Sequence, residues 1–226
     1  MFSVLFTLVT ASPPLAHHGQ QYHPGQRVRL PNDLTKLPIP KTWPMDGGHF
    51  VTLPLVVTKD SDGEHNLGMY RAQVHNETEL GLHWQIHKHA ADHAAKGERM
   101  PVAVCIGGPP ELIFSAIAPL PDNLSEYQFA GILGSRSLRI TKALTQDLMV
   151  PAEADIVIEG YCIPGETRLE GPFGEWTGYY AGDAEQDPVF KITKIYHRNN
   201  PILTCAASHH DLAAAARHVE GVDLLS

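Results

Sequence analysis

Residues 50–58 read Phe50-Val51-Thr52-Leu53-Pro54-Leu55-Val56-Val57-Thr58, and this apolar, β-branched run predicts a strand. Pro54 cannot donate to a sheet ladder, so it indicates an edge position or a bulge. Short turns lead into a second predicted strand over Asn66–Val74 and a third over Leu82–His89. Three successive strands joined by short turns predict a β-meander.

The third strand alternates strictly between apolar and polar residues, which is typical of a half-buried strand. One face carries Leu82, Trp84 and Ile86, and the other carries His83, Gln85, His87 and His89.

Further elements follow this meander. Pro101–Gly108 predicts a buried strand, and short helices are predicted over Ala90–Gly97, from Pro110 to about Ala118, and over Leu124–Leu133. The whole chain predicts about eight strands and three short helices, hence an α+β domain on a mixed or barrel-like sheet.

Composition narrows the class of protein. The chain has 226 residues with 43% hydrophobic and 19% charged residues, as expected for a globular protein with a core. A net charge of −8 argues against nucleic acid as a partner. The three cysteines form no CxxC pair, which favours a reducing compartment, so we expect a cytoplasmic protein. The apolar run Met1–Ser12 lacks a basic segment before it, so a secretory leader is not favoured.

Two acids, Glu170 and Glu175, flank a Gly-Pro-Phe-Gly turn. They either decorate the surface or point into one pocket, and an arginine beside them, such as Arg71, could keep one acid ionised while the other donates a proton. Asn66, His87 and Glu126 offer donor types that suit a divalent ion. The residues alone leave simpler roles open: a helix-capping acid for Glu126, a solvent-facing imidazole for His87 and a surface cation for Arg71.

Four sequence blocks, taken in this order, resemble the signature blocks of UbiD-type (3-octaprenyl-4-hydroxybenzoate carboxy-lyase-like) decarboxylases, which depend on prenylated FMN. They are Asn66-x-Gly68-x-Tyr70-Arg71, Trp84-x-x-His87, Pro119-x-Pro121-Asp122-x-x-Ser125-Glu126-Tyr127 and Glu170-Gly171-Pro172-Phe173-Gly174-Glu175-x-Thr177-Gly178-Tyr179-Tyr180. The resemblance covers roughly residues 30–205.

The resemblance implies a split β-barrel-like flavin-binding domain at residues 31–205. An irregular lead-in at 1–30 would precede it, and a short helical or disordered tail at 206–226 would follow. It places the end of the chain before the family's C-terminal domain, which contributes to the active-site cleft and to oligomerisation. The implied reaction is the reversible, non-oxidative decarboxylation of an aromatic or α,β-unsaturated carboxylic acid.

The resemblance also implies the site residues. Arg71, Glu170 and Glu175 match the catalytic network, with Glu175 as the proton donor. Asn66, His87 and Glu126 match the ligands of a divalent metal, usually Mn²⁺, that holds the flavin phosphate, and main-chain oxygens around Ser115–Ala118 match a K⁺ site. The full cofactor-binding set would be Asn66, Met69, Arg71, Ile86, His87, Ala118, Pro119 and Glu126.

The implied partners are a small carboxylic acid as substrate, a flavin prenyltransferase as cofactor supplier, and a second copy or a partner subunit. Two alternatives stand beside this reading. One is a catalytically incomplete fragment that binds flavin or metal or assembles with a partner. The other is a flavin reductase-like oxidoreductase, which the paired acids and Arg71 disfavour because hydride transfer to flavin needs no such network.

Overall fold

The computed structural model describes residues 27–60, 63–84, 96–121, 124–175, 177–180 and 182–206. Its strands are β1 (Arg27–Leu30), β2 (Phe50–Val51), β3 (Pro54–Lys59), β4 (His65–Met69), β5 (Ala72–Asn76), β6 (Glu79–Leu82), β7 (Met100–Ile106), β8 (Ile140–Lys142), β9 (Met149–Pro151), β10 (Ile156–Glu170) and β11 (Glu185–Arg198). Its helices are the 3₁₀ turn η2 (Leu34–Lys36), α2 (Pro110–Ser115) and α3 (Glu126–Leu133).

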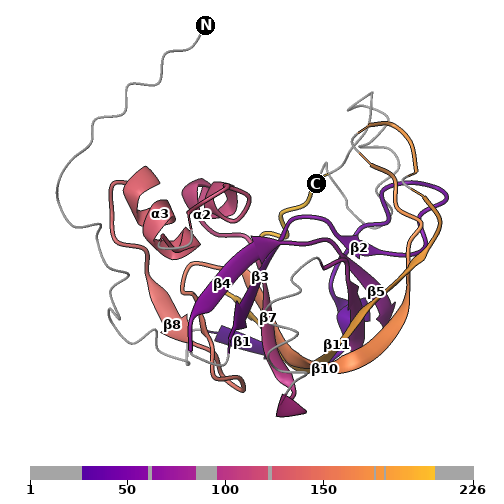
Figure 1. The fold of residues 1–226 in the computed structure, drawn as a ribbon, viewed down its shortest axis with the longest axis horizontal. Helices are drawn as coiled ribbons and strands as arrows, with labels where there is room; N and C mark the ends of the chain where they lie inside the picture. Colours follow the sequence, from indigo (N-terminus) through magenta and orange to yellow (C-terminus); the bar gives the residue numbers. More distant parts are fainter. Residues whose placement is uncertain are drawn as a thin grey trace, which may run out of the picture.

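One antiparallel sheet organises the molecule, in the order β2-β5-β6-β11-β10-β7-β3-β4, with β1 added to β11. Two-residue links, Thr52-Leu53 and Tyr70-Arg71, connect β2 to β3 and β4 to β5, although these strands lie at opposite ends of that order. Such short links span only a few ångströms, so the sheet has to curl until its two ends meet. Figure 1 shows β4 and β3 on one side, β2 and β5 on the other, and the long β10 and β11 passing beneath both. Among the described residues no ladder of hydrogen bonds joins the end strands β2 and β4, so the sheet is open rather than closed into a barrel.

The predicted order of pairing is confirmed: the first predicted segment pairs with the second, and the second pairs with β6, which ends at Leu82 where the third was predicted to begin. β4 pairs with β3, whereas β5 pairs with β2 and β6. The predicted strand over residues 66–74 is broken at Tyr70-Arg71, where the chain crosses from one end of the sheet to the other. The predicted strand over residues 50–58 is likewise broken at Thr52-Leu53, so Pro54 begins β3 instead of interrupting it.

The central strands bury both faces, in two separate cores. On β7, Val102, Val104 and Ile106 pack inside the curl, whereas Ala103 and Cys105 pack outside it. The outer core also contains residues of the two helices and of the β8–β9 hairpin. This double burial explains why β7 reads as a continuous apolar run rather than as an alternating one.

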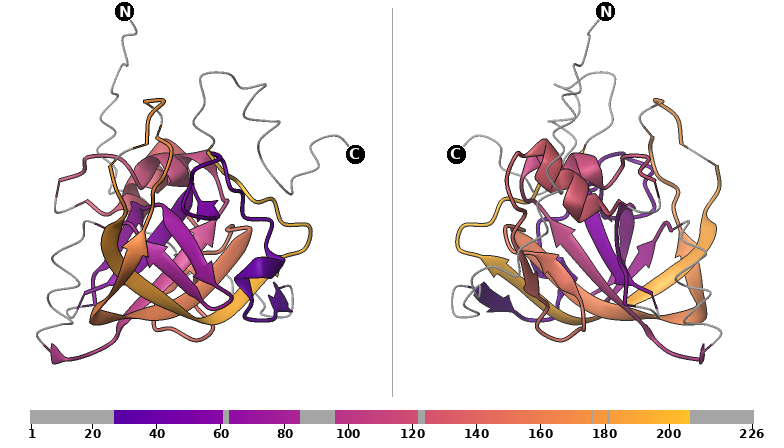
Figure 2. Two further views of the ribbon diagram at one scale, coloured as in Figure 1. Left: turned by 90° about the vertical axis from the view of Figure 1, so that its right-hand side faces the viewer. Right: turned by 60° about the vertical axis from the view of Figure 1, so that its left-hand side comes forward.

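The two helices lie together at one side of the sheet, next to β4 (Figures 1 and 2). Pro110 opens α2, and Ser125 caps α3 in a reciprocal capping box with Gln128. These two helices were predicted, whereas nearly all of the third, over residues 90–97, lies outside the described residues. In the part of the chain that the structure describes, no helix is long and apolar enough to cross a membrane.

Residues 27–30 differ from the irregular lead-in that the sequence predicts. They form β1, whose register runs from Arg27 opposite Arg198 to Leu30 opposite Ile195. The remaining domain boundaries stay a prediction.

Candidate functional site

The Gly171–Gly174 turn is bound tightly to the body of the protein. Gly171 N donates to Gln73 Oε1 at 2.7 Å, and Gly174 N donates to Asp46 Oδ1 at 2.8 Å. The carbonyl of Pro172 accepts from Gly47 N at 2.8 Å. These bonds fix the ends of the turn, and therefore the places from which Glu170 and Glu175 project.

Arg71 joins the two acids of this turn. Its Nε and Nη2 donate to the two carboxylate oxygens of Glu170 at 2.9 Å each, and its Nη1 lies 3.6 Å from Glu175 Oε1. The Glu170 side chain is 1% exposed, whereas that of Glu175 is 33% exposed. The Arg71 guanidinium also lies over the ring of Phe173, 4.9 Å from its centroid. The two acids therefore share one arginine, but only Glu170 is held by a buried, two-pronged ion pair.

Electrostatics keep Arg71 charged. Burial alone would lower its pKa, but its hydrogen bonds to Glu170 and the charges of Glu170, Glu175 and Asp187 raise the pKa above its ordinary value. The site therefore contains a permanent cation that faces three carboxylates.

His83 and Asp187 extend this network. His83 Nδ1 lies 2.9 Å from Asp187 Oδ2 and 3.9 Å from Glu170 Oε2. One donor atom from each of His83, Glu170 and Asp187 lies within 4.8 Å of the others, close enough to surround a metal ion. Because both oxygens of Glu170 already accept from Arg71, we describe the cluster as an ion-pair network rather than a metal centre.

A second set of polar groups lies between β4 and α3. The Glu126 carboxylate, in the first turn of α3, accepts from Leu67 N at 3.3 Å, directly beside Asn66 on β4. Asn66 Nδ2 is buried without a hydrogen-bond partner among the described residues. The amide oxygen of Asn66 and the carboxylate of Glu126 are ligand types that a divalent ion prefers, so these two side chains fit such a site.

Tyr70 links the two sets. Burial raises the pKa of the Tyr70 phenol, the side-chain amide of Asn66 opposes that rise, and the charge of Glu126 adds to it. The phenol therefore interacts with both of these predicted metal ligands. Its ring folds back over Gly68: a Cβ on that glycine would lie 2.3 Å from the ring. Met69, Tyr70, Arg71 and His83 line a cavity of about 310 Å³. Both sets of polar groups thus converge on the link between β4 and β5.

Four other residues were predicted for the site. Ile86 and His87 lie outside the described residues. Ala118 and Pro119 lie in the turn after α2, where Ala118 N donates to the carbonyl of Ser115 at 3.2 Å. The roles of all four residues, and the K⁺ site, stay predictions.

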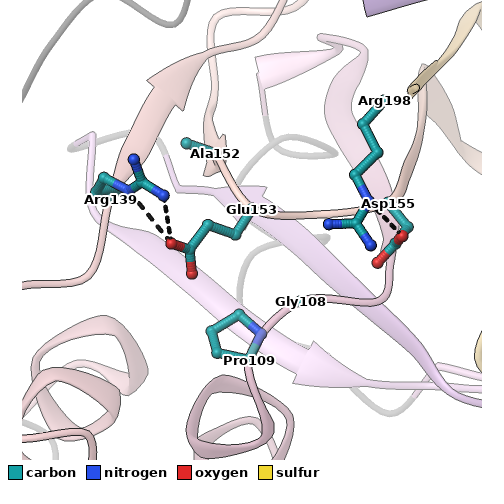
Figure 3. A pocket seen from close by; sticks show the side chains of 7 residues that line it. All are labelled: Gly108, Pro109, Arg139, Ala152, Glu153, Asp155 and Arg198. Carbon is teal, nitrogen blue, oxygen red and sulfur yellow. Dashed lines mark hydrogen bonds and ion pairs between the residues drawn. The ribbon is translucent and has the colours of Figure 1, made fainter. Parts of the chain in front are cut away.

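A larger cavity, of about 380 Å³, lies by the start of α2 (Figure 3). Its two arginines are already paired, Arg139 with Glu153 and Arg198 with Asp155, each at 2.6 Å. It therefore offers no uncompensated charge for a ligand, and none of the residues predicted for the site lines it.

Sequence reasoning did not single out four polar residues of the site. Asp46 and Gln73 bind the turn, and His83 and Asp187 extend the ion-pair network. A weak signal existed for His83, which lies on the polar face of the predicted third strand. Asp187 has no such signal, because its partner is 104 residues away in the sequence.

Comparisons with known proteins agree with this architecture. A sequence profile for the 3-octaprenyl-4-hydroxybenzoate carboxy-lyase (UbiD) Rift-related domain matches residues 19–210. An uncharacterised protein from Archaeoglobus fulgidus is 51% identical over 175 residues, which cover 75% of this chain and 36% of that protein.

Solved structures with a similar fold include the following two. One is an evolved dimeric form of the UbiD-class enzyme HmfF from Pelotomaculum thermopropionicum in complex with prFMN, with a TM-score of 0.75 and 32% identity over 80% of this chain and 43% of that one. The other is the open form of Sedimentibacter hydroxybenzoicus vanillic acid decarboxylase, with a TM-score of 0.70 and 35% identity over 78% of this chain and 38% of that one. The chain spans less than half the length of these relatives. The predicted fold, a split-barrel-like sheet with short helices as in flavin-binding UbiD-class proteins, is confirmed.

Proposed function

Because this chain belongs to the UbiD family of carboxy-lyases, we propose that it is a prenylated-FMN-dependent decarboxylase acting on an aromatic or α,β-unsaturated carboxylic acid. The observation that carries the proposal is the Arg71–Glu170 ion pair, with two bonds of 2.9 Å and Glu175 at 3.6 Å from the same guanidinium. A buried arginine can bind the carboxylate of a substrate, and an acid beside that arginine can hold the proton that the product needs.

Asn66, Glu126 and His87 would hold the divalent ion, usually Mn²⁺ in the family, at the cofactor phosphate. The position of the Glu126 carboxylate, which accepts from Leu67 N at 3.3 Å directly beside Asn66, supports this assignment. Met69, Ile86, Ala118 and Pro119 would contact the cofactor, and main-chain oxygens around Ser115–Ala118 would bind K⁺. When bound, the cofactor would supply an electron sink for the electron pair that loss of CO₂ leaves behind.

The chain's own side chains would perform the remaining steps. Arg71 would orient the substrate carboxylate while it stabilises the ionised form of Glu170. Glu175 is the more exposed acid and the less tightly bound one, so it is the better placed of the two to take up a proton from solvent. In a full turnover the substrate carboxylate leaves as CO₂. The proton of Glu175 then takes its place on the carbon to which the carboxylate was bonded.

The proposal is tested by co-expressing the chain with a flavin prenyltransferase and purifying it. Mass and absorption spectra then report bound prenylated FMN, metal analysis reports Mn²⁺, and a panel of unsaturated and aromatic acids is assayed for CO₂ release. Bound cofactor with CO₂ release is expected. A protein that takes up no cofactor would rule the proposal out.

A second candidate is suggested by the similar HmfF enzyme, whose evolved form is dimeric. In this candidate the chain binds flavin or metal but needs a partner subunit, or a second copy, to complete the cleft. Bound cofactor without CO₂ release would favour it over the complete enzyme.

A further inference from the structure

The chemistry proposed above leaves two ionisable residues of the network without a role. His83 follows β6 and Asp187 lies on β11, and the two meet at 2.9 Å, with Glu170 Oε2 3.9 Å from the same imidazole nitrogen. The Asp187 side chain is 11% exposed and that of Glu170 is 1% exposed, whereas His83 is 33% exposed. The pair therefore lies between the buried acid and solvent.

Counting charges shows why this pair matters. Glu170, Glu175 and Asp187 all act on Arg71, so three carboxylates face one permanent cation. Partly buried anions in excess of cations are costly unless another positive group or a proton compensates them. The imidazole of His83 is the titratable base that lies against these acids, with its Nδ1 2.9 Å from Asp187 Oδ2 and 3.9 Å from Glu170 Oε2.

The other titratable group facing Glu170 is a poorer source of positive charge. His75 on β5 interacts with Glu170, but burial and Arg168 lower the pKa of His75, and the charges of Glu79 and Glu170 only partly oppose them. Its Nε2 is also buried without a hydrogen-bond partner among the described residues. His75 therefore tends to stay neutral where a cation is needed.

We propose that His83 and Asp187 are positioning residues of the same proton-holding network, acting through Glu170 to set the pH range in which the network can keep a proton for the product. The role in turnover rests on the proposed function, whereas the coupling between the pair and Glu170 does not. Each turnover consumes one proton, because a carboxylate becomes CO₂ and a C–H bond. The network must therefore be reprotonated from solvent every cycle, and its charge balance governs how readily that happens.

The state of Asp187 is consistent with this coupling. Burial raises its pKa and the charge of Glu170 adds to the rise, whereas His83, by its hydrogen bond and charge, and Arg71 oppose it. Asp187 can therefore report on both neighbours.

The coupling is tested first on the cofactor-free chain by following the Asp187 carboxyl carbon in an NMR pH titration. His83→Gln removes one of the two groups that oppose the rise in the Asp187 pKa, so the Asp187 midpoint should move up by about one pH unit, and Glu170→Gln should move it down. His65→Gln serves as the control, because His65 bonds to Met149 N, outside the network. An Asp187 midpoint that neither variant moves would overturn the proposal.

The second measurement is the pH dependence of CO₂ release by the loaded protein. His83→Gln should shift the rate profile to higher pH and Asp187→Asn should shift it to lower pH, since they remove a basic and an acidic group, and the double variant should return towards wild type. A purely structural role would instead lower the rate at every pH without opposite shifts, and that result contradicts the proposal.

If the wild-type protein releases no CO₂, the proposed function fails, and the NMR titration still decides whether the pair is coupled to Glu170. If His83→Gln does not fold, Asp187→Asn and Glu170→Gln still give the two tests.

Discussion

Arg71 binds both carboxylate oxygens of Glu170 at 2.9 Å, although 99 positions separate the two residues in the sequence. This pair ties the β4–β5 link to the last residue of β10. It is thus both a structural contact across the curled sheet and the centre of the proposed catalytic network.

Removing the arginine should destabilise the fold strongly. Arg71→Ala leaves the buried Glu170 carboxylate without its partner, and we expect a loss of about 3–5 kcal/mol in the free energy of unfolding. Urea denaturation of the cofactor-free chain measures this loss. The matched control is Arg168→Ala, which breaks an exposed ion pair with Glu79 and should cost no more than about 1 kcal/mol. Equal losses in the two variants would contradict the importance of burial.

Glu175→Gln should abolish turnover without loss of cofactor. The amide is nearly isosteric with the acid but cannot donate the proton, so the rate of CO₂ release should fall by a factor of about 10²–10⁴. Absorption spectra of the purified variant check that the flavin stays bound. Glu77→Gln, in an exposed turn, should keep full activity. Loss of flavin from the Glu175 variant would argue against a proton-donor role.

Asp46 should prove essential for the position of the catalytic turn. This buried carboxylate accepts from Gly174 N and Trp43 N at 2.8 Å and from the Thr42 hydroxyl at 3.1 Å. Asp46→Ala would leave those donors without their acceptor, at an expected cost of about 1–3 kcal/mol in unfolding free energy and with a reduced rate of CO₂ release. The control is Asp183→Asn, an exposed residue on the following loop. An Asp46 variant as stable and active as that control would show that the turn holds itself in place.

Gly68→Ala should weaken metal binding. The new Cβ would lie 2.3 Å from the Tyr70 ring, so the ring would have to leave its position beside Asn66 and Glu126. Metal analysis of protein purified with Mn²⁺ should show a reduced content. Gly134→Ala is the control, because its Cβ would meet only the flexible side chain of Glu111. An unchanged Mn²⁺ content in the Gly68 variant would show that the position of Tyr70 does not affect metal binding.

Stability should fall as the pH falls below neutrality. Burial lowers the pKa of His65 below its ordinary value of 6.5, and burial does the same for His75. The folded state then binds protons less readily than the unfolded state, so the stability is present above pH 6.5 and is lost as the pH falls through the lowered folded values. Urea unfolding at a series of pH values should show this slope, and His65→Gln together with His75→Gln should flatten it. A slope that the double variant retains would have to come from other groups.

The sequence predicted those parts of the site that are encoded in local blocks. Arg71, Glu170 and Glu175 each stand out within a motif, and the structure brings them together; Asn66 and Glu126 also lie near each other. The break between β4 and β5 could not be predicted in this way. Residues 66–74 read as one continuous strand, and only the curl of the whole sheet interrupts it at Tyr70-Arg71.

The contacts of Asp46 and Asp187 were missed for a related reason. Each partner lies more than a hundred residues away, Gly174 for Asp46 and His83 for Asp187. No local spacing records such a contact, and an aspartate near a glycine or a proline is common in ordinary turns.

The order of the strands in the sheet also has a consequence for how the protein is made. β3 and β4, and likewise β2, β5 and β6, can pair as soon as they leave the ribosome, since both sets are complete by residue 82. The strands that join these two sets, β7, β10 and β11, come later, and the last of them ends at Arg198. Arg71 is therefore synthesised long before its partner exists, and the site cannot assemble until nearly the whole domain has emerged. Such long-range closure predicts slow folding for a chain of this size, with the two early hairpin sets waiting for the strands that unite them.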